Sequence, residues 1–575
     1  MNYKDLYQKW LTDECFDDAT KAELKSIEND EKEIEDRFYT ELEFGTAGLR
    51  GVIGAGTNRM NKYIVQKATQ GLANFLKGQG LQNPKVVIAY DSRNKSDTFA
   101  MDTALVLAAN GIKAYLFESL RAVPQLSFAL RTLKADAGVV ITASHNPPEY
   151  NGYKVYGNDG AQVIAPFDKM IIDEVNSITD FSTIKTTTET EAKADGLLEI
   201  IGENIDKLYI EQVKSQVINQ DVINKVADEF KIVYTPLHGT GNLPVRRALK
   251  EVGFKNVYVV AEQEKPDGNF PTVKSPNPED PNAFKLAIEL AKKEQADIII
   301  GTDPDADRVG VLIRDEKGEY IVLTGNMIGT MLTDYILRGR KENGSLPTNG
   351  VVIKTIVTTE MIRPICEFYG SDVIEVLTGF KFIGEQIKNF ETTNQHSYVF
   401  GFEESYGALA GTYARDKDAV VTSLLACEMA AYYKLNGMTL YEALVALYQK
   451  FGYYREDVQS FTLKGIEGIG KIKNIMETLR NQQIDTIGGY QILAKRDYKT
   501  QQRVTKDGTT SKIELPVSDV IYFELSNNAW ICVRPSGTEP KIKFYIGVKG
   551  QSLEDANNKL QAIKDDVLKI LEPLM

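Results

Sequence analysis

Apolar runs that end in polar loops recur along this sequence, and most are followed by a stretch with helical spacing. Residues 85–90 form one such run, which ends at Asp91 and precedes an apolar-rich segment at 99–109. A chain that alternates in this way packs helices against the faces of a parallel or mixed sheet. Further strands are expected at 111–116, 231–235, 256–261, 297–301, 351–357, 372–377 and 397–401, and helices at 243–251 and 281–294. We therefore expect an α/β fold with three related α/β domains and mixed sheets.

The pattern changes after Gly452, where strand-like pieces precede a single long helical stretch. The strands are expected at 458–463, 520–525, 529–533 and 542–548, and the helix at 553–571, with Ser552 and Asp555 in a capping-box pattern. The polar residues 500–512 are expected to form a loop. This part predicts a smaller C-terminal α+β domain. We place the domains at 1–208, 209–322, 323–451 and 452–575, which fits 575 residues at about 150 residues per domain.

Composition excludes several classes of protein. The chain has 67 basic and 80 acidic residues, a net charge of −13 without a basic tract, which argues against binding to nucleic acid or an anionic membrane. It contains no run of about 18 apolar residues, so we expect no membrane span. The four cysteines are far apart and form no CxxC motif. Free thiols in a reducing compartment fit best, and we expect a cytoplasmic protein.

A serine follows directly after one of the buried strands. The run 138–141 is apolar and β-branched, and it leads into Thr142-Ala143-Ser144-His145-Asn146-Pro147-Pro148. The two prolines restrict the backbone and so hold the Ser144 hydroxyl in place. A serine is a weak nucleophile until it is positioned and activated. Taken alone, the segment could also be an ordinary turn that contains a serine and a histidine.

A second strand, at 298–300, leads into a loop with carboxylates at alternate positions, Asp303, Asp305 and Asp307. Carboxylates this close repel one another unless a cation lies among them, and oxygen ligands suit Mg²⁺ or Ca²⁺. An EF-hand would need Gly and Glu at the sixth and twelfth positions, but these are Arg308 and Arg314. The loop therefore predicts a compact Mg²⁺ site; the alternative is a solvated acidic turn.

Three further loops have unusual composition. Residues 44–51 place Arg50 between glycines, and residues 401–407 carry Glu403, Glu404 and Ser405, whose oxygens could accept hydrogen bonds from sugar hydroxyls. Residues 534–540 combine Arg534, Ser536, Gly537 and Thr538, the residue types of a phosphate-binding loop. In isolation each of these loops is equally well explained as a polar turn.

Taken in order, these five loops resemble the motifs of the α-D-phosphohexomutases, and the resemblance spans nearly the whole chain. Smaller matches lie at 91–93, 151–154, 378–381 and 415–418. The resemblance implies a four-domain, heart-shaped enzyme with a central cleft, active as a monomer or homodimer on a hexose phosphate. It implies that glucose 1-phosphate and glucose 6-phosphate are interconverted through a phosphoserine and a 1,6-bisphosphate, which also serves as activator.

The resemblance also implies roles for individual residues. Ser144 would carry the phosphoryl group and, with the three aspartates, bind Mg²⁺. Among the positions near the reacting phosphoryl group, we favour His145 and Lys417 as general acid and base. The other positions near that group are Arg50 and Lys154. The expected substrate-binding residues are Arg308, Thr378, Gly379, Lys381, Glu403, Ser405, Arg534, Ser536, Gly537 and Thr538.

Two residues depart from the common family pattern, Phe402 and Tyr406, which flank the Glu403-Glu404-Ser405 loop. Related enzymes with an altered loop act on pentose phosphates or synthesise glucose 1,6-bisphosphate, and a mannose phosphate is a further alternative. The retained acidic residues favour glucose phosphates over N-acetylglucosamine phosphates.

Two other classes of protein remain as alternatives. A serine hydrolase using Ser144 and His145 is disfavoured because the sequence has no G-x-S-x-G motif and adjacent residues rarely align as nucleophile and base. A non-catalytic sugar-phosphate sensor is disfavoured because the serine and all three aspartates are present.

Overall fold

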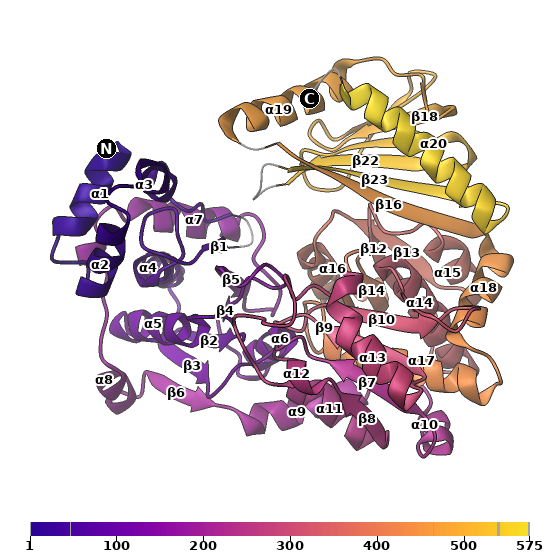
Figure 1. The fold of residues 1–575 in the computed structure, drawn as a ribbon, viewed down its shortest axis with the longest axis horizontal. Coiled ribbons are helices and arrows are strands. Elements are labelled where there is room, and N and C mark those ends of the chain that lie inside the picture. Colours follow the sequence, from indigo (N-terminus) through magenta and orange to yellow (C-terminus); the bar gives the residue numbers. More distant parts are fainter. Residues whose placement is uncertain (1, 46–47, 464, 537–540, 573–575) are drawn as a thin grey trace. The chain divides into compact units, whose positions relative to one another are not determined.

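The computed structural model describes residues 2–45, 48–463, 465–536 and 541–572. The chain forms two compact units, which interleave along the sequence. The first unit comprises Met1–Val322, Ile383–Thr392 and Gly407–Leu435, and the second comprises Leu323–Phe382, Thr393–Tyr406 and Asn436–Met575. Figure 1 labels the elements of both units.

The first sheet of the first unit is mixed, in the order β1-β5-β4-β2-β3-β6. Strands β2, β3, β4 and β6 are parallel, and β5 runs antiparallel to both β4 and β1. Buried side chains of α4 and α5 pack on Val86 and Ile88 of β2 and on Val139 and Ile141 of β4. This packing places the carboxyl ends of β2 and β4 at one edge of the sheet. The bounds are β1 Leu49–Val52, β2 Lys85–Tyr90, β3 Lys113–Phe117, β4 Ala137–Ile141, β5 Tyr150–Gly157 and β6 Leu198–Ile201.

The second sheet of this unit has the order β11-β10-β9-β7-β8. Strands β7, β8 and β9 are parallel, whereas β10 is antiparallel to β9 and to β11. The tight turn from β9 to β10 therefore carries the acidic loop at the carboxyl end of a buried strand. The bounds are β7 Lys231–Thr235, β8 Asn256–Val259, β9 Ile298–Thr302, β10 Val309–Arg314 and β11 Tyr320–Val322. The short strand β15, Ala408–Ala410, follows later in the chain and is not part of this sheet.

The helices of the first unit cover these sheets and confirm the three that the sequence predicts there: 99–109 lies within α5, 243–251 within α11, and 281–294 corresponds to a 3₁₀ turn at Pro281–Phe284 followed by α13. Their bounds are α1 Tyr3–Thr12, α2 Asp18–Ser26, α3 Glu31–Phe38, α4 Lys62–Gly78, α5 Ser96–Ala109, α6 Val123–Thr132, α7 Phe167–Ser177, α8 Glu189–Ala194, α9 Glu203–Lys214, α10 Gln220–Val226, α11 Asn242–Val252, α12 Ala261–Glu264, α13 Lys285–Glu294 and α17 Ala419–Leu435. A second 3₁₀ turn lies at Phe181–Thr183, and α16, Phe380–Thr393, belongs in part to each unit.

The second unit contains a parallel α/β part and a β-rich part. In the first of these, β12 pairs in parallel with β13 and β14. The β-rich part is an antiparallel sheet in the order β16-β23-β22-β21-β18-β19-β20, with β17 paired to β18 and with α19 and α20 packed on it. The bounds are β12 Gly350–Thr355, β13 Asp372–Val376, β14 Ser397–Phe402, β16 Tyr453–Thr462, β17 Thr486–Ile487, β18 Tyr490–Asp497, β19 Gln502–Thr505, β20 Thr510–Lys512, β21 Ile521–Leu525, β22 Trp530–Pro535, β23 Lys541–Gly550, α14 Gly325–Glu342, α15 Ile362–Tyr369, α18 Leu440–Phe451, α19 Gly465–Asn481, α20 Leu553–Leu571 and a 3₁₀ turn at Ser526–Asn528.

The C-terminal helix is confirmed, but the loop expected at 500–512 is wrong. α20 has the predicted bounds, and the Ser552 side chain accepts a hydrogen bond from Asp555 N. Residues 500–512 instead contain the β19–β20 hairpin, whose turn includes Gly508 at φ +84°. The hairpin lies at the edge of the sheet, so its polar side chains face water and leave no hydrophobic alternation to detect. Arg503 nevertheless anchors it through an ion pair with Glu524 at 2.7 Å.

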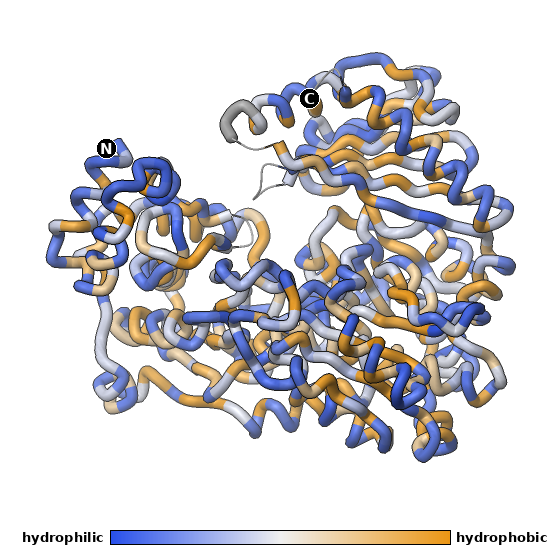
Figure 2. The backbone as a smooth tube through the Cα atoms, viewed as in Figure 1, coloured by the Kyte–Doolittle hydropathy of each residue, from blue (hydrophilic) through white to orange (hydrophobic). Residues whose placement is uncertain are grey.

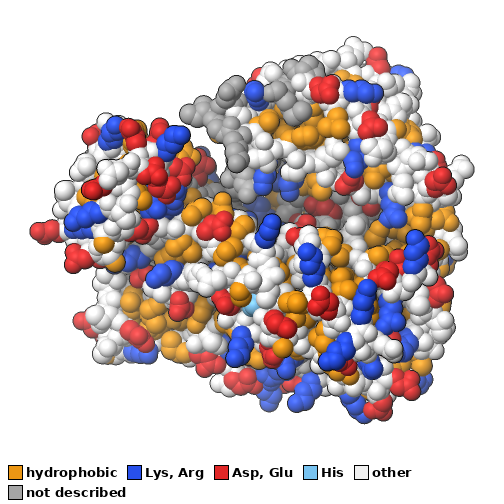
Figure 3. Space-filling view, viewed as in Figure 1, with side chains coloured by type: hydrophobic (Ala, Val, Ile, Leu, Met, Phe, Trp, Pro, Cys, Tyr) orange, Lys and Arg blue, Asp and Glu red, His pale blue; other side chains and the backbone are white. Residues whose placement is uncertain are grey.

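Apolar residues lie mainly in the interior of the protein, and charged residues of both signs lie on its surface. Apolar segments follow the central strands of the sheets in Figure 2, and acidic and basic side chains are interspersed on the face shown in Figure 3. Within the described part of the chain, no helix combines the length and apolar character that a membrane crossing requires.

One buried carboxyl group on α5 gives a testable pH dependence. Asp102 Oδ2 is buried without a hydrogen-bond partner, and Gln66 Nε2 lies 3.5 Å from Oδ1. Burial raises the pKa of Asp102 to about 6, against the opposing effect of Lys62. The folded state therefore binds the proton more tightly than the unfolded state, so its stability falls as pH rises from about 4 to about 6 and is constant above that range.

We expect Asp102→Asn to stabilise the protein by about 1–2 kcal/mol at pH 8, since one pKa unit is worth about 1.4 kcal/mol. The gain should shrink as pH is lowered to 5. Calorimetric Tm values of variant and parent at both pH values measure this, with the exposed Asp173→Asn as control. A gain of equal size at both pH values would contradict the assignment.

Candidate active site

Ser144 lies in a turn that directs its hydroxyl toward the acidic loop of the second sheet. Beyond the end of β4, Thr142 Oγ1 accepts a hydrogen bond from Ser144 N at 2.8 Å, and Ser144 adopts φ +52°. The Ser144 hydroxyl donates to Asp303 Oδ2 at 2.8 Å and lies 3.1 Å from His145 Nδ1. Residues 144 and 303 therefore meet within the first unit, as the sequence predicts.

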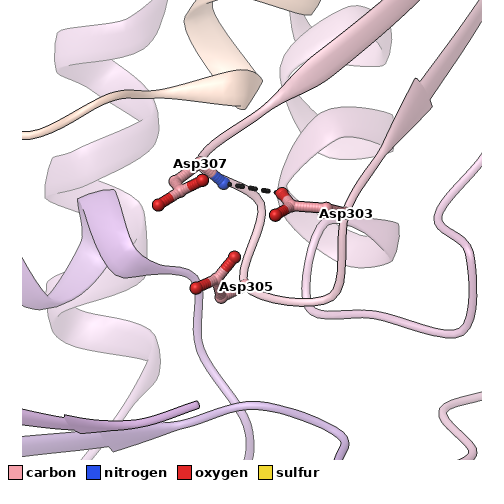
Figure 4. Close-up of side chains that lie close together, drawn as sticks. All are labelled: Asp303, Asp305 and Asp307. Atoms are coloured by element: carbon pink, nitrogen blue, oxygen red, sulfur yellow. Dashed lines mark hydrogen bonds between the residues drawn. The ribbon is translucent and has the colours of Figure 1, made fainter. Parts of the chain in front are cut away.

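The three aspartates converge at the turn from β9 to β10 (Figure 4). Asp303 Oδ1 accepts hydrogen bonds from the backbone N–H groups of Asp307, at 3.1 Å, and Arg308, at 3.0 Å, which fix the turn. All three side chains are buried, and one oxygen of each lies within 4.8 Å of the others.

This group has the chemistry of a cation site. Asp305 Oδ1 and Asp307 Oδ1 are buried and make no hydrogen bond, so each has an acceptor without a protein donor. Unpaired buried carboxylate oxygens are costly in the absence of compensation. A hard divalent cation bound by one oxygen from each aspartate would compensate them, and the residues present fit such an ion.

The charges around the aspartates shift their pKa values in different directions. Burial, reinforced by the neighbouring carboxylates, raises the pKa of Asp303 and of Asp307. Burial also acts to raise the pKa of Asp305, but Lys154 and hydrogen bonds outweigh it, so that this pKa is lowered. The raised pKa values indicate that Lys154 and Lys417 do not neutralise all of the negative charge of the three aspartates.

Two lysines reach into the cluster from different elements. Lys154 on β5 lies 3.0 Å from Asp305 Oδ2 and 3.9 Å from Asp307 Oδ2. Lys417, in the loop before α17, lies 3.1 Å from both Asp307 Oδ2 and Asp416 Oδ1. Both ammonium groups therefore lie beside the aspartate loop to which the Ser144 hydroxyl donates.

His145 and two arginines complete the predicted set in this unit. Burial, helped by Arg308 and Arg50, lowers the pKa of His145 well below its ordinary value, so the ring is neutral near pH 7. Arg50 Nη1 donates to Asn146 Oδ1 at 3.3 Å, and Arg308 forms an ion pair with Glu279. Arg50 is thus beside the serine loop, whereas the Arg308 guanidinium pairs with Glu279 and has its Nε 3.9 Å from Asp307 Oδ1.

The Ser144 and His145 side chains lie within hydrogen-bonding distance of each other, although adjacent residues rarely align as nucleophile and base. A hydrolytic triad also needs a group that orients the histidine. In the described ranges no carboxylate forms a hydrogen bond with the His145 ring, and Ser144 instead bonds to Asp303. The geometry therefore does not favour the serine hydrolase.

In the second unit, the two loops expected to bind the sugar are joined by a hydrogen bond. Gly379 N donates to Glu403 Oε1 at 3.1 Å, and Thr355 Oγ1 donates to Glu404 Oε2 at 3.4 Å. Thr378 Oγ1 is buried without a partner. These contacts order the loops at the carboxyl ends of β12, β13 and β14. The neighbouring positions expected to bind substrate are Lys381 and Ser405.

Phe402, one of the departures from the family pattern, belongs to the core. It is 1% exposed, and a Cβ added at Gly329 of α14 would lie 2.1 Å from its ring. Phe402 therefore packs against a helix rather than lining the loop of Glu403 and Ser405. Tyr406 adopts φ +68° at the end of this loop.

The expected phosphate-binding loop connects β22 to β23. Arg534 is near the end of β22, and Ser536 N donates to Lys541 O at 2.7 Å across the hairpin. The pKa of Tyr545 is raised by burial and by Glu404 and is lowered in part by Arg534. The remaining expected residues, Gly537 and Thr538, lie outside the described residues.

Sequence reasoning did not single out several residues that contact the site. Thr142 also donates to Asp305 Oδ2 at 3.0 Å, so it links the serine loop to the aspartates. Tyr156 donates to Asp416 Oδ2 at 2.8 Å and thereby fixes the partner of Lys417. Position after a strand could have indicated Thr142, but no sequence signal indicates Tyr156.

Comparison with known proteins identifies relatives over most of the chain. Residues 41–181, 207–318 and 324–451 match models of phosphoglucomutase/phosphomannomutase alpha/beta/alpha domains I, II and III. A phosphoglucomutase from Staphylococcus haemolyticus is 40% identical over 531 residues, covering 92% of this chain and 94% of the relative. One from Staphylococcus aureus is 38% identical over 549 residues, covering 95% and 97%.

Solved structures with the same fold include two proteins of lower sequence identity. Parafusin, a phosphoglucomutase from Paramecium, has a TM-score of 0.65 at 17% identity and covers 93% of this chain and 95% of that one. A phosphoglucomutase/phosphomannomutase family protein from Burkholderia thailandensis has a TM-score of 0.65 at 18% identity, with coverage of 93% and 98%. These structures support the architecture of three α/β/α domains followed by a β-rich C-terminal part.

Proposed function

The chain belongs to the phosphoglucomutase/phosphomannomutase family of α-D-phosphohexomutases, and on this premise we propose that it interconverts glucose 1-phosphate and glucose 6-phosphate. The observation that carries the proposal is the 2.8 Å contact of the Ser144 hydroxyl with Asp303, inside a buried cluster of three carboxylates. Glucose is preferred because relatives named phosphoglucomutase are 38–40% identical and because the Glu403-Glu404-Ser405 loop is retained.

Ser144 acts as the carrier of the phosphoryl group. In the first half-reaction the bond between phosphorus and Ser144 Oγ breaks and a bond to the free hydroxyl oxygen of the sugar phosphate forms. The hydroxyl proton passes to a base, and an acid protonates the departing Ser144 Oγ. The resulting glucose 1,6-bisphosphate, which also serves as activator, returns its other phosphoryl group to Ser144. We assign the proton transfers to His145 and Lys417. Of these, His145 is neutral near pH 7, because its pKa is lowered.

Transfer of a phosphoryl group requires in-line positioning and neutralisation of the charge on its oxygens. Mg²⁺, held by Asp303, Asp305, Asp307 and an oxygen of phosphorylated Ser144, would supply part of this positive charge. Lys154 and Arg50 supply further positive charge beside the serine loop.

The loops of the second unit bind the rest of the substrate. Glu403 accepts hydrogen bonds from sugar hydroxyls, and Ser405 accepts or donates them. The phosphate that does not react is held by Arg534, Ser536, Gly537 and Thr538. The further substrate positions are Arg308, Thr378, Gly379 and Lys381. We retain the four domain boundaries at 1–208, 209–322, 323–451 and 452–575 as part of the proposal, together with a cytoplasmic location and a monomer or homodimer.

The test is a panel of glucose 1-phosphate, mannose 1-phosphate and ribose 1-phosphate, each with a trace of the matching bisphosphate. Glucose 1-phosphate is expected to have the highest kcat/KM. A preference for ribose 1-phosphate would make the protein a phosphopentomutase, and net accumulation of glucose 1,6-bisphosphate would make it a bisphosphate synthase.

Replacing Ser536 tests the distal phosphate site. We expect Ser536→Ala to raise KM by roughly 10-fold with little change in kcat, since a hydrogen bond to a charged group is worth about 1.5–3 kcal/mol and this one serves ground state and transition state alike. Steady-state kinetics measure the two constants. Ser511→Ala, at an exposed serine of β20, is the control, and an unchanged KM in Ser536→Ala would place the distal site elsewhere.

A further inference from the structure

Arg93 binds the backbone of the serine loop through the carbonyl groups of that loop. It lies between β2 and α5, and its side chain is 3% exposed. Nη2 donates to the carbonyl oxygens of Ser144, at 2.5 Å, and of Asn146. Nη1 donates to the carbonyl oxygens of Pro147, at 2.9 Å, and Tyr150, at 3.0 Å. One guanidinium therefore satisfies three carbonyl groups of the serine loop and that of Tyr150, the first residue of β5.

The loop needs such a partner because residues 144–149 lie between β4 and β5 and belong to no strand. Buried carbonyl groups must find donors, and here the turn directs them inward together. Ser144 also adopts φ +52°, which is unfavourable for a residue with a Cβ and persists only where the surroundings fix it. A planar guanidinium offers five N–H donors in a rigid fork, whereas a lysine offers three on one atom and cannot span this loop.

The structure also fixes Arg93 itself. Asp91 Oδ1 accepts hydrogen bonds from Arg93 N at 2.9 Å and from Ser96 Oγ at 2.8 Å, and Asp91 Oδ2 lies 3.4 Å from Arg93 Nε. The guanidinium carbon lies 5.0 Å from the centre of the Phe270 ring. The segment that carries Phe270 fits closely, since a Cβ added at Gly268 would lie 2.4 Å from Asn94 N.

We propose that Arg93 is a positioning residue for phosphoryl transfer, which holds the backbone of residues 144–150 so that Ser144 Oγ stays aligned with the aspartate cluster. Arg93 does not contact the reacting atoms and acts through four carbonyl groups. Its ion pair with Asp91 and its contact with Phe270 fix the orientation of the guanidinium. The catalytic consequence rests on the proposed mutase function, whereas the ordering of the loop does not.

The test compares Arg93→Lys with Arg59→Lys. Arg59 is a matched control because it is 6% exposed, lies in the same unit and binds Asp36 and Glu33 instead of the serine loop. We expect Arg93→Lys to lower kcat about 100-fold with KM changed less than about 3-fold, the cost typical of a displacement near 1 Å. Arg59→Lys should leave both constants near the parental values.

Chemical rescue and hydrogen exchange separate positioning from a merely structural role. Added guanidinium should restore part of the kcat of Arg93→Ala and none of the loss caused by any other substitution. Backbone amides in 144–151 should exchange faster in Arg93→Lys than in the parent, and equally in Arg59→Lys. If Arg93→Ala does not fold, Asp91→Asn provides the second variant, with the same kinetic and exchange pattern in weaker form.

The outcomes distinguish the two proposals. A parental kcat in Arg93→Lys, or unchanged exchange at 144–151, would overturn the positioning role. A parent protein without mutase activity on any sugar phosphate would refute the proposed function, while faster exchange in Arg93→Lys would still support the ordering of the loop.

Discussion

Ser144→Ala is expected to lower turnover by roughly 10⁴-fold or more, since removal of a nucleophile leaves only binding and electrostatic contributions. The parent protein should also carry an addition of about 80 Da, the mass of one phosphoryl group, which the variant lacks. Intact-mass measurement and a mutase assay on the same samples test both statements. The hydroxyl that is lost donates to Asp303 at 2.8 Å, so the substitution removes one of the hydrogen bonds that connect the two loops of the site.

A matched control is available in the second unit. Ser371 is also buried, and its Oγ makes no hydrogen bond, so Ser371→Ala should retain both the added mass and the turnover. Turnover by Ser144→Ala close to that of the parent would refute the phosphoserine assignment. If the parent is active but never carries the added mass, and Ser144→Ala is inactive, the result would instead favour hydrolytic use of the serine.

The position of each central loop at the end of a buried strand was predictable from the sequence pattern, but the contact between the two loops was not. The apolar runs at 138–141 and 298–300 identify β4 and β9, and polar residues that follow parallel strands gather at the carboxyl edge of their sheet. What places both edges in one site is packing between elements far apart in the chain. Only the family resemblance, which links the motifs, predicted that Ser144 and Asp303 would meet.

Other features left no trace in the sequence. The positive φ of Ser144 is unusual for a residue other than glycine, and a pattern of residue types does not reveal it. The role of Arg93 depends on backbone carbonyl groups at positions 144–150. Every residue type has such a carbonyl group, so the sequence does not reveal these contacts. Contacts made through the backbone are therefore the part of the site that sequence reasoning misses most readily.

Phe402 shows the opposite error, in which a visible departure proved structural. Its place beside Glu403 suggested an altered sugar site, yet the ring packs on Gly329 of α14. In a strand, successive side chains point to opposite faces, so the neighbour of a binding residue is commonly a core residue. Phe402 is also the last residue of β14, in which residues 398–402 are all buried.

Asp305→Ala is expected to abolish turnover, by roughly 10³-fold or more, while leaving the fold intact. The substitution removes one of three cation ligands and the 3.0 Å partner of Lys154, and a single lost electrostatic contact to a transferring group can cost 10²–10³-fold alone. Parent protein treated with EDTA should lose activity and regain it with added Mg²⁺, whereas the variant should not respond. Asp228→Ala, at an exposed aspartate of the same unit, is the control and should behave like the parent.

The stability of Asp305→Ala separates a metal-binding role from a structural one. Crowding with Asp305 contributes to the raised pKa values of Asp303 and Asp307, so in EDTA its removal relieves repulsion between buried charges. In the variant, Lys154 Nζ still has a carboxylate partner, Asp307 Oδ2, at 3.9 Å. The Tm in EDTA should therefore match or exceed that of the parent, and added Mg²⁺ should raise the Tm of the parent alone. Full activity of the EDTA-treated variant, or an equal Tm gain from Mg²⁺ in both proteins, would remove Asp305 from the cation site.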